Sequence, residues 1–228
     1  MNKRKKPFLT IAIPAYNEEG NIENLIRNIL SQKQEYFTLK NIKVYTDACT
    51  DRTIPIIKKL QKSYQQIKLI EGKTRHGKMY RQNQIFADCK EDYLILLDAD
   101  IQPIGQDFIN NLSKELIDDP KANLVVAHQI PLKPKNFIGK ILSATFLMWD
   151  YVRLSMPSQN HLQNFYPSAC AYRGSFARTL KFPKVATEDR IYIYLMAKKT
   201  NSFRYTFKAK ANYWTVSTIR DYINLSHR

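Results

Sequence analysis

The chain has 228 residues, of which 44% are hydrophobic and 25% charged; this composition is ordinary for a globular protein and excludes a disordered or collagen-like chain. Lysine and arginine total 36 against 20 aspartates and glutamates, which gives a net charge of +16. Such a charge predicts an anionic partner, which can be nucleic acid, an anionic membrane surface or a phosphorylated small molecule.

Hydrophobic periodicity predicts strands that alternate with helices along the first hundred residues. Between residues 18 and 32, for example, apolar residues recur at three- and four-residue spacing, which is typical of a helix. The expected strands are residues 8–13, 41–45, 67–71 and 93–97, and the expected helices are residues 18–32, 53–64 and 78–89. This alternation predicts an α/β fold with a largely parallel sheet that is covered on both faces.

The alternation loosens after Pro103. Helices are expected at residues 108–116, 137–154, 187–198 and 217–226, and strands at residues 123–129, 166–172, 203–207 and 209–213, the last two as separate strands or one bent strand. The aromatic-rich helix at residues 137–154 is expected either to cover the core or to lie on a membrane. Without an internal repeat or a linker, residues 1–228 are expected to form one domain, with halves at residues 1–103 and 104–228.

Targeting and redox signals are few. The apolar run that follows the basic N-terminus, residues 8–15, is short and broken by Pro14, so no signal peptide is expected. No run of about 18 apolar residues predicts a membrane span. The three cysteines, Cys49, Cys89 and Cys170, form no CxxC pair, which favours reduced thiols in a cytoplasmic protein.

Three of the expected strands end in polar residues that suit a binding or catalytic site. The first leads into residues 14–18, the second into residues 47–51, and the fourth into Asp98-Ala99-Asp100. Ligands of open α/β sheets bind beyond the carboxyl ends of the strands. Carboxylates gathered at one edge repel one another, and bound Mn²⁺ or Mg²⁺ would offset that cost. Alone, the pair Asp98 and Asp100 is weak evidence, because aspartate is common where a strand passes into a loop.

Four segments around that pair, in this order, resemble the motifs of family 2 glycosyltransferases, which share the fold named GT-A. They are residues 11–19 (IAIPAYNEE), residues 44–53 (VYTDACTDRT), Gly77-Lys78 with Asn83, and Thr187-Glu188-Asp189. The resemblance runs from about residue 8 to about residue 211 and, as an ordered set, is specific. It implies a Rossmann-like, mostly parallel mixed sheet flanked by helices, with a nucleotide-binding first half and an acceptor-binding second half.

The resemblance also implies an inverting transfer of a sugar from a nucleotide diphosphate sugar, a UDP-sugar by family frequency, to a hydroxyl acceptor. The residues that it assigns to the nucleotide are Pro14, Ala15, Tyr16, Glu18, Asp47, Lys78 and Asp98. Among them, Asp47 would bind the nucleobase and Lys78 the base or the phosphates. For Lys78, a solvated helix face is an equally good interpretation.

The metal and the general base are assigned in the same way. Asp100 would ligate Mn²⁺ or Mg²⁺, and Asp98 would share the metal or contact the ribose. Asp189, beside Glu188, would deprotonate the acceptor hydroxyl. The structural alternative is that Thr187 caps the N-terminus of a helix and that Glu188 and Asp189 stabilise the first turn of that helix. Both interpretations can hold together.

Two features depart from the family pattern. Ala48 and Cys49 stand where the second motif usually has Gly-Ser. Residues 215–228 do not show the Gln-x-x-Arg-Trp motif of processive members, which weakens the case for polymer synthesis and leaves processivity open.

Two other classes of function compete with this interpretation. A nucleotidyltransferase would favour a Gly-rich loop directly after the first strand, where the sequence has Gly20 alone. A basic nucleic-acid-binding protein would use clustered aromatic residues, which are scattered here, so nucleic acid is not the expected partner. The basic charge then fits a lipid-linked or cell-envelope acceptor and an anionic membrane surface, with a cytoplasmic protein peripheral at the inner face of the membrane.

Overall fold

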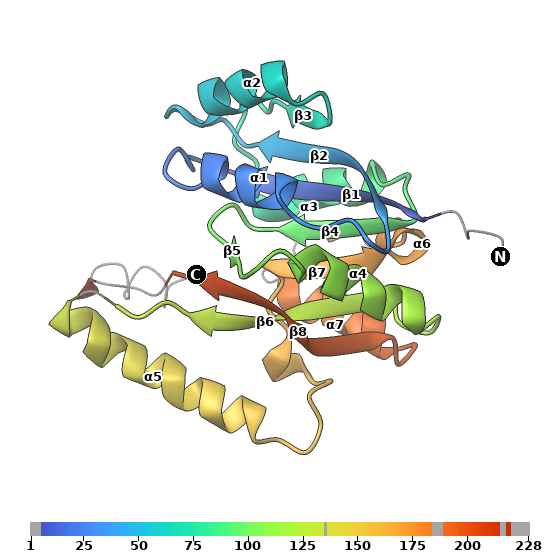
Figure 1. The fold of residues 1–228 in the computed structure, drawn as a ribbon. Coiled ribbons are helices and arrows are strands. Elements are labelled where there is room, and N and C mark those ends of the chain that lie inside the picture. The colour runs from blue at the N-terminus through green and yellow to red at the C-terminus, as the bar shows by residue number, and fades with distance from the viewer. Residues whose placement is uncertain (1–5, 135, 184–188, 215–217, 220–228) are drawn as a thin grey trace.

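The computed structural model describes residues 6–134, 136–183, 189–214 and 218–219. Across these residues, eight strands form one sheet in the order β3-β2-β1-β4-β7-β6-β8-β5 (Figure 1). The strands are β1 (Phe8–Ala15), β2 (Thr38–Thr46), β3 (Ile67–Ile70), β4 (Tyr93–Leu97), β5 (Gln102–Pro103), β6 (Leu124–Pro131), β7 (Ala169–Arg173) and β8 (Phe203–Tyr213). The pairs β1–β2, β1–β4, β2–β3 and β6–β8 are parallel and the other three are antiparallel, so the expected mostly parallel mixed sheet is confirmed.

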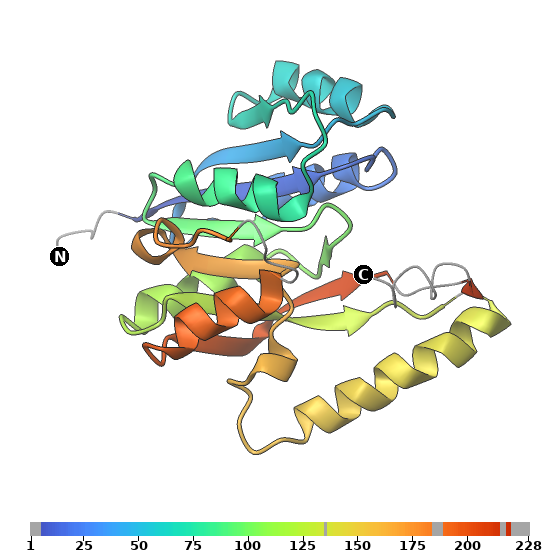
Figure 2. The ribbon, with the colours of Figure 1, turned by 180° about the vertical axis from the view of Figure 1, so that it is seen from behind.

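Helices cover both faces of this sheet. The helices α1 (Ile22–Leu30), α2 (Thr53–Ser63) and α4 (Phe108–Asp118) pack on one face. The helices α3 (Lys78–Ala87), α6 (Gly174–Ala177) and α7 (Asp189–Lys198) lie on the other, which Figure 2 shows from behind. The long helix α5 (Phe137–Leu154) lies to the side of both layers and is followed by the short 3₁₀ helix η1 (Leu162–Asn164).

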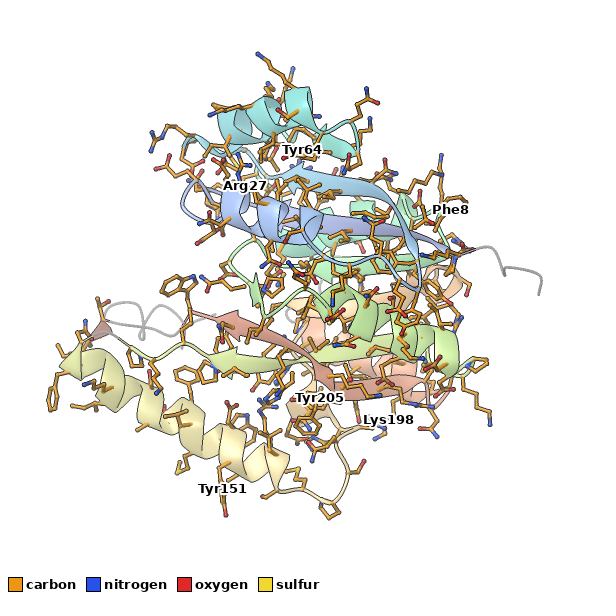
Figure 3. All side chains as sticks on the ribbon, in the orientation of Figure 1. Phe8, Arg27, Tyr64, Tyr151, Lys198 and Tyr205 are labelled. Carbon is orange, nitrogen blue, oxygen red and sulfur yellow. The ribbon has the colours of Figure 1, made fainter. Side chains whose placement is uncertain are left out.

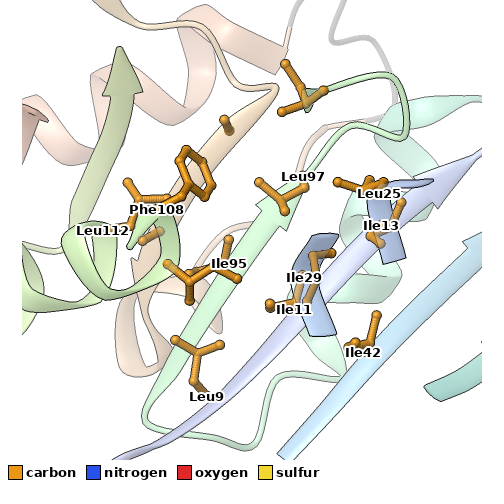
Figure 4. Packing of buried hydrophobic residues seen from close by; sticks show 14 of the residues in the cluster. Leu9, Ile11, Ile13, Leu25, Ile29, Ile42, Ile95, Leu97, Phe108 and Leu112 are labelled. Carbon is orange, nitrogen blue, oxygen red and sulfur yellow. The ribbon is translucent and has the colours of Figure 1, made fainter. Parts of the chain in front are cut away.

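Strand β4 shows why the centre of the sheet is apolar throughout. Successive side chains of a strand point to opposite faces. Ile95 and Leu97 therefore join the cluster beneath α1 and α4, which Figure 4 shows from close by. Leu94 and Leu96 join the cluster beneath α3 and α7. A strand that is buried on both sides fixes the position of the residue that follows it, which is Asp98.

Several boundaries differ from the expected ones. The first helix begins at Ile22 rather than at residue 18, because residues 18–21 form a turn in which the Ile22 amide donates to the Glu18 carbonyl at 2.9 Å. The strands expected at 203–207 and 209–213 are one strand, β8, whose register against β6 shifts between Ala127 and His128. The expected helix at 217–226 lies almost wholly outside the described residues.

Among the helices of the described residues, none is both long enough and apolar enough to cross a bilayer.

Candidate active site

A pocket of about 470 Å³ opens where β1, β2 and β4 end, since neighbouring parallel strands bring their carboxyl ends to one edge of the sheet. Every residue predicted to bind the nucleotide or the metal lines this pocket: Pro14, Ala15, Tyr16, Glu18, Asp47, Lys78, Asp98 and Asp100. The remaining lining residues are Arg75, Gly77, Arg81 and Ala99. Segments up to 86 residues apart in sequence thus form one site.

The loop after β1 is held by the segment after β2. The Glu18 amide donates to Thr53 Oγ1 at 2.7 Å, and the Glu19 amide donates to Asp51 Oδ2 at 3.0 Å. In return, Asn17 Oδ1 accepts from the Thr50 amide at 2.8 Å. The first two sequence motifs are therefore one structural unit, in which polar side chains of the second fix the backbone of the first.

Asp47 organises the opposite wall of the pocket. It is 4% exposed, and its carboxylate accepts hydrogen bonds from the amides of His76 at 2.9 Å and Gly77 at 2.8 Å. Its Oδ1 also accepts from Nε of Arg81 at 2.9 Å. Burial alone would raise the pKa of Asp47, but these hydrogen bonds outweigh it and lower the pKa below the ordinary value. The carboxylate is therefore charged and holds the turn before α3 against the strand ends.

Gly77 and Lys78 follow from that turn. Gly77 has a φ of +87°, which favours glycine, and Lys78 is the first residue of α3. The Lys78 ammonium lies 2.7 Å from Oδ2 of Asp98, so a cation reaches the edge of the pocket where the acids gather. The side chain is 42% exposed, which leaves room for a ligand to approach it.

Three carboxylates share the floor of the pocket. Burial raises the pKa of Asp100, and the neighbouring charge of Asp98 raises it further while Lys78 opposes the shift. Burial likewise raises the pKa of Glu18. A hydrogen bond from Asn21 opposes this rise, and the charges of Asp100 and Asp98 add to it. A cation bound here would relieve both the burial and the mutual repulsion of the acids.

The donor set of the floor fits a hard divalent cation. Asp98 and Asp100 offer carboxylate oxygens, which Mg²⁺ and Mn²⁺ prefer. Within the described residues, no three acidic, histidine or cysteine side chains converge into a complete metal cage. A cation held here would therefore need further oxygen ligands, as is usual where a carboxylate and substrate phosphates bind Mg²⁺ together.

Comparison with known proteins gives the family. The model described as "Glycosyl transferase family 2" matches residues 10–180. The chain belongs to glycosyl transferase family 2. The family and the glycosyltransferase class expected from the four motifs are thereby confirmed.

Curated relatives of this family 2 chain are named glycosyltransferases or polysaccharide synthases. It is 28% identical to a poly-beta-1,6-N-acetyl-D-glucosamine synthase of Staphylococcus aureus over 133 residues, which cover 58% of this chain and 31% of the relative. It is 31% identical to dolichyl N-acetyl-alpha-D-glucosaminyl phosphate 3-beta-D-2,3-diacetamido-2,3-dideoxy-beta-D-glucuronosyltransferase of Methanococcus voltae over 109 residues, 46% of this chain and 32% of the relative. The matches thus span about a third of the length of these relatives.

Solved structures with the same fold include a mannosyltransferase and the S. aureus protein TarS. The mannosyltransferase PcManGT from Pyrobaculum calidifontis, in complex with GDP-Man and Mn²⁺, has a TM-score of 0.67 at 21% identity, over 92% of this chain and 57% of that one. S. aureus TarS 1–349, in complex with UDP-GlcNAc, has a TM-score of 0.68 at 15% identity, over 94% of this chain and 60% of that one. The expected GT-A fold of this family 2 chain is therefore confirmed.

The predicted base of the family 2 chain is positioned only in part. Asp189 is the first residue of α7, and its side chain is not among the described ones. Glu188 and Thr187 lie outside the described residues. The roles of Asp189 and Glu188 stay predictions from the resemblance.

Two pocket residues were not predicted from the sequence. The guanidinium carbon of Arg75 lies 3.7 Å from the centre of the Tyr16 ring, so the two side chains stack at the mouth of the pocket. Arg81 is 4% exposed and pairs with Asp47 at 2.8 Å. The only sequence signal for these two residues was their positive charge close to Gly77, with Arg75 two residues before it and Arg81 four residues after it. In a basic sequence, neither charge stands out.

Proposed function

We propose that this chain is an inverting, metal-dependent glycosyltransferase that moves a sugar from a nucleotide diphosphate sugar to a hydroxyl acceptor. The observation that carries the proposal is the single pocket that gathers Asp47, Lys78, Asp98 and Asp100 at the ends of neighbouring strands. In a family 2 chain, this arrangement supports a nucleobase against one wall and a diphosphate above the acidic floor, with a divalent cation between the acids and the diphosphate. The complexes of PcManGT with GDP-Man and of TarS with UDP-GlcNAc support a nucleotide-sugar donor.

Within that pocket, the nucleotide would lie between the loop after β1 and the turn that Asp47 holds. Tyr16, which Arg75 covers at 3.7 Å, offers an aromatic face to the nucleobase. Lys78 would bind a donor phosphate in place of Asp98, because its ammonium is partly exposed and only 2.7 Å from that carboxylate. We propose a UDP-sugar as the donor, on the frequency of uridine nucleotides in the family.

The metal site of the proposal consists of Asp100 as ligand, with Asp98 sharing the cation or contacting the ribose. Bound Mn²⁺ or Mg²⁺ would neutralise negative charge on the departing nucleoside diphosphate. The complexes of PcManGT and of glucosyl-3-phosphoglycerate synthase from Mycobacterium tuberculosis with Mn²⁺ support a divalent ion of this kind. The raised pKa of Asp100, which burial and Asp98 cause, supports the same position.

Inversion requires attack from the face opposite the leaving group. The acceptor oxygen would form a bond to the anomeric carbon as the bond from that carbon to the donor phosphate oxygen breaks. Its proton would pass to the carboxylate of Asp189 at the start of α7, and the nucleoside diphosphate would leave. Glu188 is proposed beside the base as a second acid of the same motif.

The acceptor is proposed to be a hydroxyl of a lipid-linked or cell-envelope glycan. Two relatives support this class, since one is a poly-beta-1,6-N-acetyl-D-glucosamine synthase and the other a glucuronosyltransferase named for a dolichyl-linked sugar phosphate. A cytoplasmic protein, peripheral at the inner face of the membrane, stays the predicted location.

A panel of nucleotide sugars tests the proposal directly. We expect at least one UDP-sugar to raise the melting temperature of the protein in the presence of Mn²⁺, and to release a nucleoside diphosphate when a glycan acceptor is added. Release of pyrophosphate would instead indicate a nucleotidyltransferase. If tight, salt-sensitive RNA or DNA binding accompanied a complete lack of response to nucleotide sugars, the proposal would be wrong.

A further inference from the structure

Helix α5 packs with its polar side inward. Among the α5 side chains that the structure describes, those turned toward the protein recur at helical spacing and are mostly small or polar: Gly139, Ser143, Asp150 and Arg153, together with Phe146 and Leu154. An ordinary surface helix places its apolar stripe against the core and its charged residues in water. The order in α5 is therefore reversed.

The inward contacts of α5 are polar and well formed. Arg153 is 1% exposed, and its Nε donates to Asp150 at 2.8 Å. Its Nη1 donates to the buried Asn164 at 2.7 Å, and its guanidinium lies 5.3 Å from the ring centre of Tyr166. The one acid and one of the two basic residues of α5 are thus used inside the protein, so the rotation of the helix about its axis is fixed.

The outward side of α5 is mostly apolar, with Lys140 in its first turn. Its five most exposed large apolar residues are Tyr151 (77%), Phe137 (75%), Met148 (65%), Ile141 (57%) and Leu147 (56%). At 100° per residue, these five fall within one continuous stripe opposite Arg153. In Figure 3, the labelled side chain of Tyr151 points away from the rest of the protein.

The sequence around α5 is basic. Residues 120–187 contain nine lysines and arginines and a single acid, Asp150, which pairs with Arg153. Lys133 and Lys140 are exposed beside the start of the helix. An apolar stripe bordered by basic residues is the pattern of a helix that lies in the surface of an anionic bilayer.

The position of α5 suits a reaction at such a surface. Strand β6 runs in the same direction as β4, since each pairs antiparallel with β7. Its end, from which the chain continues into α5, therefore lies at the same edge of the sheet as the pocket (Figure 1). Trp149, 42% exposed, and Tyr151 each combine an apolar ring with a polar group, as side chains at membrane interfaces commonly do.

We propose that α5 is a membrane-contacting helix, which lies parallel to an anionic lipid surface with its apolar stripe below the headgroups. Lys133 and Lys140 face the lipid phosphates. A second copy of the chain fits this face less well, because its surroundings are strongly basic and two such faces repel each other. This binding is independent of glycosyl transfer, so its test does not depend on the proposed function.

Vesicle co-sedimentation of the whole chain tests the proposal. We expect the protein to sediment with vesicles that contain phosphatidylglycerol, to sediment much less with phosphatidylcholine alone, and to be released as salt rises to about 0.5 M. The double variant M148E/Y151E is expected to lower the apparent affinity at least about tenfold, because both carboxylates would have to enter the apolar boundary. The variant should keep its melting temperature, since both side chains are exposed in the protein.

The matched control is L195E/K199Q on α7 and the residue after it. It changes the net charge by the same amount, and both positions are exposed, Leu195 by 50%. We expect its affinity to stay within about twofold of the parent. Equal losses in both double variants would reduce the effect to net charge and overturn the proposal. So would a folded parent that does not bind anionic vesicles at low salt, or a dimer that M148E/Y151E dissociates while vesicle binding is unchanged.

Discussion

The pocket edge of the first half and helix α5 of the second half use polar residues in opposite ways. At the pocket, the buried Asp47 and the half-buried Asp100 face a cavity, and backbone amides and Arg81 hold Asp47 in place. In α5, the polar pair Asp150–Arg153 is turned inward, and the apolar side chains face out. The first arrangement serves a small charged ligand, and the second serves an extended apolar surface.

The charges of the chain follow the same division. Residues 1–119 contain 19 basic and 16 acidic residues, whereas residues 120–228 contain 17 basic and 4 acidic ones. The net charge of +16 is therefore concentrated in the part that carries α5 and the proposed acceptor side. A net charge for the whole chain hides this difference, and the comparison predicts that the two parts respond differently to substitution.

The largest effect is expected at the proposed base. Asp189→Asn removes the proton acceptor but keeps the shape of the side chain, so it should lower kcat about 10²–10⁴-fold. Metal-dependent donor binding should survive, since it depends on the first half. Single-turnover transfer and calorimetric titration of the donor measure the two effects separately. Asp118→Asn, at an exposed ion pair on α4, is the control that should keep its activity; equal activity of the two variants would remove Asp189 from the mechanism.

The next effect is on stability and concerns the buried pair on the pocket wall. Arg81→Met leaves the Asp47 carboxylate buried without its cation, which should cost about 3 kcal/mol of unfolding free energy. Arg27→Met removes an exposed pair with Glu23 on α1 and should cost less than about 0.5 kcal/mol. Urea unfolding of both variants measures the difference. Similar losses of unfolding free energy in the two variants would mean that the stability of the pocket wall does not depend on the Arg81–Asp47 pair.

The same pair predicts a pH dependence. Burial opposes ionisation of Asp47, but the bonds from His76, Gly77 and Arg81 make its folded pKa the lower one. Its contribution to stability is therefore complete above the ordinary aspartate pKa of about 3.9 and is lost as the pH falls through the folded value. Arg81→Met should shrink this acid loss in urea unfolding repeated down to about pH 3. If the unfolding free energy of Arg81→Met fell with pH as steeply as that of the parent, the pH dependence would not come from the Asp47–Arg81 pair.

The smallest effect is expected at Ala48, which has a φ of +58°. Left-handed backbone is costly for alanine and not for glycine, so Ala48→Gly should stabilise the protein by about 0.5 kcal/mol after the extra chain entropy of glycine is subtracted. In α5, Ala144→Gly should instead destabilise by roughly 0.5–1 kcal/mol, because the backbone is helical there. In chemical unfolding, the unfolding free energy should therefore rise for Ala48→Gly and fall for Ala144→Gly. A lower unfolding free energy for Ala48→Gly would show that alanine is preferred at this turn.

The sequence was informative where local chemistry determines the structure. Runs such as residues 93–97 predicted buried strands, and the acids that follow them predicted the pocket, because parallel strands end at one edge. Arg81 was missed since its partner Asp47 is 34 residues away and only the fold brings them together. The start of α1 was misplaced because the hydrogen bonds of Glu18 and Glu19 to Thr53 and Asp51 are likewise long-range.

Helix α5 shows a different limit. Its bounds at Phe137–Leu154 agree with the sequence prediction, but periodicity does not tell which side of a helix faces the protein. The inward rotation depends on the contact of Arg153 with Asn164, and Asn164 belongs to another element, η1. For this reason, a core-covering helix and a membrane-facing helix remained equally good interpretations at the level of sequence.

Calorimetric titration of nucleoside diphosphates, with and without Mn²⁺, tests the central claim most directly. We expect UDP to bind the unmodified chain at least about tenfold more tightly with Mn²⁺, because the ion joins the diphosphate to Asp100. Asp100→Ala should abolish this enhancement, and Asp118→Ala should keep it. Binding by Asp100→Ala that still strengthens with Mn²⁺, or no binding of any nucleoside diphosphate by the folded parent, would contradict the account.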